Sequence, residues 1–256
     1  MKTSTMRNNS PKRLRLWAVA FWLAMWQLLA MCVSQELLLA SPVSVLKCLL
    51  GLMTDGEFWA TLAFSLLRIA GGFMIGCLSG AVLGGLSGCF RPARELLAPF
   101  LALIRAIPVA SFVIVALIWV PSRNLSLLIS ALIVWPVVYS NVLAGIDAAD
   151  PRLIEMADVF RIPPVRRLLM IHIPQVMPYF RAAVATGMGL AWKSGVAAEV
   201  IGIPDGSIGE RLYRAKIYLM TPELFAWTIA LVALSIACEK LALLFMDAAI
   251  DRIGRI

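Results

Sequence analysis

Six apolar stretches, each about as long as a bilayer-spanning helix or longer, take up most of this sequence. A helix needs roughly 20 apolar residues to cross about 30 Å of hydrocarbon. Only 15% of the residues are charged, against about 25% in a typical soluble domain. The pattern predicts an all-α, polytopic membrane protein with about six transmembrane helices, over residues 16–33, 58–89, 96–120, 125–146, 179–201 and 223–245.

The distribution of Lys and Arg predicts the orientation of these helices, because cytoplasmic loops of membrane proteins are enriched in both. One side carries fourteen: Lys2, Arg7, Lys12, Arg13, Arg15, Arg91, Arg94, Arg152, Arg161, Arg166, Arg167, Arg181, Arg252 and Arg255. The other side carries five: Lys47, Arg123, Arg211, Arg214 and Lys216. We therefore expect both termini in the cytoplasm, with a tail over 1–15, one transmembrane domain over 16–256, a cytoplasmic loop over 147–178 and an external loop over 202–222.

The remaining composition excludes several classes of function. The net charge of +8 is explained by orientation, and no Lys/Arg run is interleaved with aromatic residues, so nucleic acid is not expected as a partner. His172 is the only histidine and the five cysteines form no CxxC pair, so no metal site is expected. The apolar stretches contain no convergent catalytic set, and we do not expect an enzyme.

A glycine at every fourth position marks the second apolar stretch. Because a helix advances a little over one turn in four residues, these glycines form one slowly drifting stripe that lets another backbone approach closely. Packing within the chain is the preferred interpretation, and dimerisation through the stripe is the second. The residues are Gly72, Gly76, Gly80, Gly84 and Gly88.

The polar loop over 150–178 has the pattern of two short helices. Asp150 can cap free amides and Pro151 suits a first helical position, so a helix is expected to begin there. An apolar stripe follows with helical spacing, and Pro163-Pro164 ends it before a second short helix over 165–171. The loop is predicted to dock on a protein groove or on the lipid surface, and its acids favour the protein. The stripe consists of Leu153, Ala157 and Phe160.

The loop resembles the EAA loop of inner-membrane permease subunits in binding-protein-dependent ABC importers. That pattern is Glu-Ala-Ala, three residues, Gly, about nine residues and Ile-x-Leu-Pro; here it reads EMADVFR (155–161) and IHIP (171–174). Three further stretches, over 65–76, 103–119 and 191–202, resemble the nitrate, sulfonate and taurine branch of that family. One departure is that Arg161 stands where the family has its glycine.

The resemblance implies a subunit of an ATP-driven importer in the bacterial inner membrane. It implies a second permease subunit, with a homodimer expected, and a periplasmic or lipid-anchored substrate-binding protein. Two cytoplasmic ATPases would hold ATP and Mg²⁺, since this chain has no P-loop: GMGLAWKS (187–194) lacks the required second glycine. The residues expected to couple to the ATPase are Leu153, Glu155, Ala157, Phe160 and Arg161.

Four ionisable residues lie within the apolar stretches, where such residues are costly and usually functional. The excess of cations indicates an anionic or strongly polar substrate, such as nitrate, a sulfonate or taurine. An equally weighted interpretation is that the cations pair with carbonyls or acids elsewhere. The candidate pathway residues are Arg68, Arg105, Lys193 and Glu199.

The alternative function is an ion-gradient-driven secondary transporter that works without an ATPase. That class often shows internal repeats, and none is evident between residues 1–124 and 125–256. The sequence leaves open which solute is carried, and whether the second permease subunit is identical.

Overall fold

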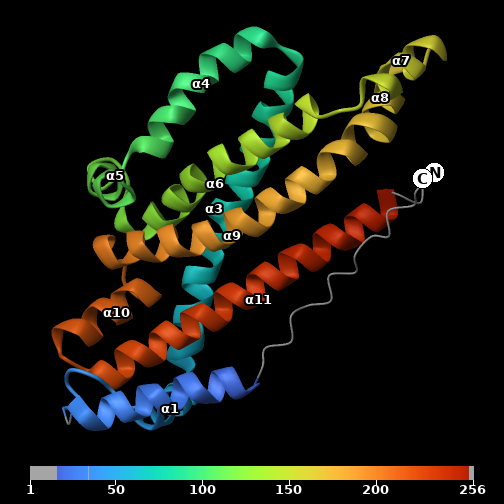
Figure 1. Cartoon of the computed structure of the whole chain (residues 1–256). Coiled ribbons are helices and arrows are strands. Elements are labelled where there is room, and N and C mark those ends of the chain that lie inside the picture. Colours follow the sequence, from blue (N-terminus) through green and yellow to red (C-terminus); the bar gives the residue numbers. More distant parts are fainter. Residues whose placement is uncertain (1–15, 34, 254–256) are drawn as a thin grey trace.

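The structure, a computed structural model, describes residues 16–33 and 35–253, and every regular element in these ranges is a helix (Figure 1). The all-α class is therefore confirmed, while the expected tail over 1–15 lies outside the described residues. The helices are α1 (Leu16–Val33), α2 (Pro42–Met53), α3 (Gly56–Cys89), α4 (Arg91–Ala106), α5 (Val109–Ala116), α6 (Ser122–Asp147), α7 (Pro151–Val159), α8 (Pro164–Arg167), the π-helix η1 (Leu168–His172), α9 (Ile173–Gly202), α10 (Ile208–Ile217) and α11 (Thr221–Ile253).

Three helices within the described residues, α3, α6 and α11, are long and apolar enough to cross a membrane, and the α4–α5 pair makes a fourth if it is one bent span. This supports a multi-pass membrane protein. The first and fifth predicted spans correspond to α1 and α9, which do not meet the same criterion. At about 1.5 Å per residue, the 34 residues of α3 extend roughly 51 Å, well beyond the hydrocarbon thickness.

The third predicted span, 96–120, is not one straight helix. Its two parts, α4 and α5, meet at an angle of 101°. Pro108 lacks a backbone N–H and disfavours the helical conformation in the residue before it, and Ile107 is accordingly extended with ψ 127°. The sequence interpretation of this span relied on apolar length and overlooked the break at this Ile-Pro pair.

The core of the described chain lies where α3, α6 and α9 meet. The glycine stripe of α3 faces α6 in the same chain, as the preferred interpretation predicted. A Cβ built on Gly76 would lie 2.7 Å from the carbonyl oxygen of Ala131, and one on Gly80 would lie 2.8 Å from the Cβ of Val138. The missing side chains therefore allow the two backbones to approach, which is small-xxx-small packing.

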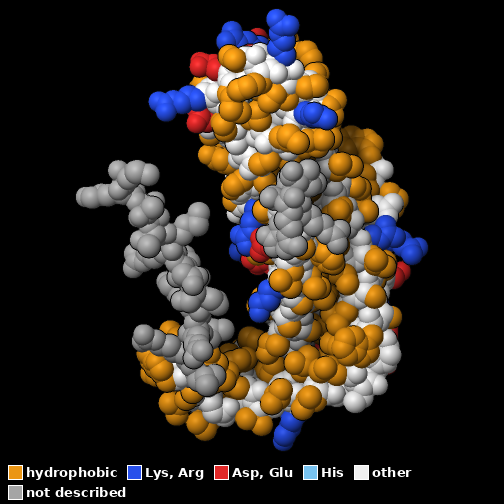
Figure 2. Space-filling model, turned by 90° about the vertical axis from the view of Figure 1, so that its right-hand side faces the viewer, with side chains coloured by type: hydrophobic (Ala, Val, Ile, Leu, Met, Phe, Trp, Pro, Cys, Tyr) orange, Lys and Arg blue, Asp and Glu red, His pale blue; other side chains and the backbone are white. Residues whose placement is uncertain are grey.

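The two ends of the molecule differ in character. At one end, Trp227 near the start of α11 stacks against Phe58 of α3, with ring centroids 5.0 Å apart. The other end carries α7 and α8, which project beyond the main bundle (Figure 1). Figure 2 shows hydrophobic side chains over much of one face, with charged side chains gathered at the α7–α8 end. The polar loop over 150–178, which carries α7 and α8, therefore lies at a charged end of the protein.

Candidate functional site

The first helix of the loop, α7, begins where the sequence predicts. Asp150 is its N-cap, and its carboxylate accepts a hydrogen bond of 2.9 Å from the amide of Arg152. The amide of Asp150 in turn donates to the side-chain oxygen of Gln175, at 2.8 Å. Gln175 belongs to α9, so the start of the loop helix is attached to a long helix of the bundle.

The turn after α7 contains Arg161, which stands where the EAA pattern has a glycine. This residue has a left-handed backbone with φ +49°. Its amide donates to the carbonyl of Asp158 at 3.1 Å, and the amide of Ile162 donates to the carbonyl of Ala157 at 2.9 Å. This pair of bonds is the Schellman motif, in which glycine normally occupies the left-handed position. Arg161 therefore makes the turn expected of the family's glycine, at a cost of about 1–2 kcal/mol.

The second half of the loop differs from the predicted short helix over 165–171. One turn of α8 is followed by η1 and then, without interruption, by α9, so the loop returns directly into the bundle. Pro174 lies directly after η1, at the point where α9 begins, and Pro178 lies inside that helix. An ion pair of 2.6 Å between Arg167 and Asp158 joins α8 to α7. The loop is consequently a compact hairpin.

The predicted docking stripe is only partly available to a partner. Ala157 is 1% exposed and lies inside the hairpin, so its side chain is not offered at the surface. Phe160 and Val159, by contrast, are 73% and 79% exposed at the tip. Leu153 is 39% exposed, and Glu155 is also exposed. The exposed apolar tip therefore includes Val159, which the sequence interpretation had not selected.

Two of the predicted pathway cations have partners inside the chain. The guanidinium of Arg68 donates to the side-chain oxygen of Asn124 and lies over the ring of Phe64, 5.5 Å from its centroid. Arg105 donates to the carbonyl oxygen of Pro136 at 2.9 Å, which joins α4 to α6. Carbonyl and amide oxygens are common partners of cations in membrane interiors. Arg68 therefore clamps α3 to α6, as the structural interpretation of the cations proposed.

The Glu199 side chain is buried and is held by hydrogen bonds within the chain. It is 0% exposed, and its Oε2 accepts hydrogen bonds from the hydroxyl of Ser65 at 2.8 Å and the amide of Gly209 at 3.3 Å. These contacts join α3, α9 and α10. A Cβ on Gly209 would lie 2.3 Å from the Cβ of Glu199, so α10 approaches α9 closely at this point. Lys193, which lies about 1.7 turns earlier in α9, is instead exposed.

A groove lined by apolar residues and a few polar ones runs between α4 and α6. Two adjoining cavities of about 370 Å³ and 330 Å³ share Arg105 and Ser140 as lining residues. One cavity ends at Arg94 and Asp147, which form a bidentate ion pair with distances of 2.9 and 3.1 Å. The other includes Asn141 of α6. The groove thus combines a guanidinium with neutral hydrogen-bonding groups and has a charged pair at one end.

Residues 72–255 of the chain match the family described as the binding-protein-dependent transport system inner membrane component. The chain belongs to this family. It is an ABC transporter permease, a transport subunit rather than an enzyme. The family implies ATPase and binding-protein partners.

Similar proteins agree with this assignment. The chain is 27% identical to a permease named for aliphatic sulfonates transport in Bacillus subtilis (strain 168), over 80% of this chain and 74% of the relative. It is also 27% identical to an ABC transporter permease of Brucella melitensis biotype 1, over 89% and 92%. A bicarbonate transport permease of Synechococcus elongatus is 30% identical, over 59% and 54%.

A solved structure supports the fold of this permease. The crystal structure of an amino acid ABC transporter with histidines has a TM-score of 0.57 to this chain, at 19% identity, and the match covers 77% of this chain and 94% of the other. At that identity the likeness concerns the fold alone. The match shows that the two chains share an arrangement of helices.

Sequence reasoning missed the groove residues other than Arg105. Ser140 and Asn141 donate to backbone carbonyls one turn earlier in α6, at 2.6 and 2.8 Å. Nothing in the sequence around them indicates that they line a cavity. Arg94 and Asp147 are separated by 53 positions. Pro136 is no signal for this contact, because a proline inside a helix frees the carbonyl four residues before it, whereas Arg105 binds the carbonyl of Pro136 itself.

Proposed function

We propose that this permease forms the substrate pathway of an ATP-driven importer and couples to a separate cytoplasmic ATPase through the loop over 150–178. The exposed tip at Val159 and Phe160 carries this proposal. Two large apolar side chains at a charged, water-facing end are costly unless a partner covers them. The capped start of α7, its left-handed turn and the Asp158–Arg167 pair hold the tip in a fixed position.

The coupling surface in this proposal consists of Leu153, Glu155, Val159 and Phe160, with Ala157 and Arg161 supporting it from within. Ala157 keeps α7 close to the rest of the hairpin, and Arg161 makes the turn that aims the tip. Movement of the ATPase would be transmitted to the bundle through Gln175, which binds the start of α7 from α9. ATP and Mg²⁺ belong to the ATPase.

The proposed orientation has six crossings of the bacterial inner membrane and both termini in the cytoplasm. Its support is the excess of Lys and Arg on the side that carries the loop. The bent α4–α5 pair would serve as one crossing. The whole importer would contain two permease subunits, expected to be identical, two ATPases and a periplasmic or lipid-anchored binding protein.

The groove between α4 and α6 is proposed as the pathway through this subunit, for a small anionic or polar solute. Arg105 supplies positive charge, while Ser140 and Asn141 supply polar atoms at its wall. The relatives named for aliphatic sulfonates and bicarbonate are named for anions. Lys193 is exposed three residues after Leu190, which lines the groove, and is the second proposed contact. Arg68 and Glu199 are proposed as structural supports instead.

Co-purification with the cognate ATPase tests the coupling surface. We expect Phe160→Glu to weaken the complex by at least 30-fold, because a buried aromatic anchor contributes about 2 kcal/mol or more. Tyr218→Glu is the matched control, since Tyr218 is also highly exposed, at 71%, but follows α10. An equally stable complex in both variants, or uptake by this chain alone in proteoliposomes, would contradict the proposal.

A further inference from the structure

An ion pair stands at one end of the groove between α4 and α6. The guanidinium of Arg94, near the start of α4, donates two hydrogen bonds to the carboxylate of Asp147, the last residue of α6, at 2.9 and 3.1 Å. Both residues line the cavity of about 370 Å³, together with Arg105 and Ser140 farther along the two helices. The pair therefore lies at the end of the groove that is nearest the loop over 150–178.

The pair is specific in geometry and modest in energy. Two parallel hydrogen bonds are the arrangement in which an arginine fork recognises a carboxylate. The side chains of Arg94 and Asp147 are 49% and 48% exposed, however. An exposed pair shifts an equilibrium by at most about fivefold. A contact of this size can hold two helices in one arrangement and still be broken by a movement that ATP drives.

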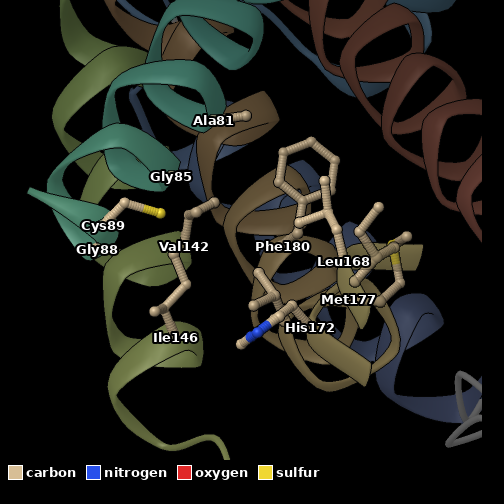
Figure 3. A pocket seen from close by; sticks show the side chains of 12 residues that line it. Ala81, Gly85, Gly88, Cys89, Val142, Ile146, Leu168, His172, Met177 and Phe180 are labelled. Atoms are coloured by element: carbon tan, nitrogen blue, oxygen red, sulfur yellow. The ribbon is translucent and has the colours of Figure 1, made fainter. Parts of the chain in front are cut away.

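The last turns of α6 lie between this groove and a second cavity. The second cavity is apolar, with a volume of about 360 Å³, and is formed by the ends of α3 and α6 on one side and by η1 with the start of α9 on the other (Figure 3). Val142 and Ile146 of α6 line the apolar cavity, whereas Leu143 and Asp147 line the groove. Residues next to each other in the sequence thus border the two spaces.

The apolar cavity gives the end of α6 room to move relative to η1. Leu168 and His172 of η1 lie across the cavity from α6 (Figure 3). The amide of Ile173 donates to the carbonyl of Leu168, five residues earlier, and the next residue, Pro174, has no N–H to donate. The connection between the loop and α9 therefore lacks a backbone hydrogen bond that a continuous α-helix would have.

We propose that the Arg94–Asp147 pair is a latch that closes the cytoplasmic end of the groove and opens when the ATPase moves the loop. Asp147 is three residues before Asp150, the N-cap of α7, so a displacement of the loop acts directly on the end of α6. Movement of that end into the apolar cavity separates the pair, and Arg94 is then free to bind an anionic solute that leaves the groove. The inference rests on the proposed function, which places the loop on the ATPase and the solute in this groove.

Labelling of a cysteine inside the groove tests the latch. Ser140→Cys, in a chain whose five native cysteines are replaced by alanine, would be reconstituted in vesicles without the ATPase. An impermeant maleimide is then added on the side of the loop. We expect Asp147→Asn to raise the labelling rate about fivefold, because the pair is lost. The charge swap Arg94→Asp with Asp147→Arg should restore the original rate.

Asp247→Asn is the matched control. Asp247 of α11 forms a bidentate pair with Arg181 of α9, at 2.5 and 3.0 Å, and the two side chains are 47% and 43% exposed. This pair also joins two helices, but neither residue lines the groove. We expect its loss to leave the labelling rate unchanged. Equal rates in the Asp147 and Asp247 variants, or a swap that does not restore the rate, would overturn the latch.

Filling the apolar cavity is the second arm of the test, in the importer assembled with its ATPase. Gly85 lines this cavity, and a Cβ built on it would meet no atom within 4 Å, so Gly85→Phe places a ring in the space. The labelling rate of Ser140→Cys should differ with and without ATP. Gly85→Phe should hold it at the lower rate in both conditions, whereas Gly51→Phe, at an equally open glycine of α2, should keep the response. An unaltered response in Gly85→Phe would overturn the movement.

Co-purification with the ATPase separates failure of the latch from failure of the proposed function. An importer that assembles and takes up solute, while its latch variants are labelled like their controls, contradicts the latch alone. A chain that never binds the ATPase contradicts the proposed function and the latch with it.

Discussion

The close contact between α3 and α6 can be tested by adding a single methyl group. In Gly80→Ala, the new Cβ would lie 2.8 Å from the Cβ of Val138 and 2.9 Å from the carbonyl oxygen of Trp135. Carbon atoms pack best at about 3.5–4.0 Å, so α6 would have to move by roughly 1 Å. Overpacking of this kind costs about 1–3 kcal/mol. We expect Gly80→Ala to lower the free energy of unfolding by that amount relative to a Gly→Ala change in α3 whose new methyl group meets no neighbour.

Gly85→Ala, on the same helix, is the matched comparison. Its Cβ would meet no atom within 4 Å, and alanine gains about 0.8–1.0 kcal/mol over glycine in a helix. Because this gain is common to both variants, they should differ by the overpacking cost of about 1–3 kcal/mol, or roughly 2–12 °C in melting temperature for a chain of this size. Thermal unfolding of the purified proteins in one detergent measures the difference. Equal melting temperatures would refute the argument that the stripe packs against α6.

Three other substitutions separate structural roles from transport roles. Arg161→Gly should raise the free energy of unfolding by about 1–2 kcal/mol, because glycine relieves the left-handed strain; a lower melting temperature would contradict the turn. Glu199→Ala should destabilise the chain by about 1–3 kcal/mol in the same melting assay, because the hydroxyl of Ser65 and the amide of Gly209 lose their acceptor; unchanged stability would contradict that role. Lys193→Ala should change stability by less than about 0.5 kcal/mol yet lower solute uptake while ATPase binding persists; unchanged uptake kinetics would remove Lys193 from the pathway.

Local patterns allowed the loop and the helix packing to be predicted from the sequence. Asp150-Pro151 specifies a capped helix start through contacts within three residues, and the period of the α3 glycines specifies one face of a helix. The same local reasoning failed at Ile107-Pro108, where apolar length was weighed above a local break in the helix. It also selected Ala157 as a surface residue, although the hairpin encloses its side chain.

The partners of the intramembrane charges could not be predicted because they are distant in the sequence. Ser65 and Glu199 are 134 positions apart, and Arg68 and Asn124 are 56 apart. Such contacts depend on how the helices pack, which a single sequence specifies only through the whole fold. From the sequence alone, a role of the cations in the substrate pathway and their pairing with carbonyls or acids had equal weight. The structure assigns Arg68 and Glu199 partners within the chain and leaves Lys193 exposed.

ATP-driven uptake tests the central claim most directly. The chain would be reconstituted in proteoliposomes with its cognate ATPase and binding protein, and entry of the binding protein's own solute would be followed with and without ATP. We predict uptake that requires ATP and all three components and that Phe160→Glu abolishes, with Tyr218→Glu behaving as wild type. Uptake that follows an ion gradient without the ATPase, or that Phe160→Glu leaves unchanged, would contradict the account.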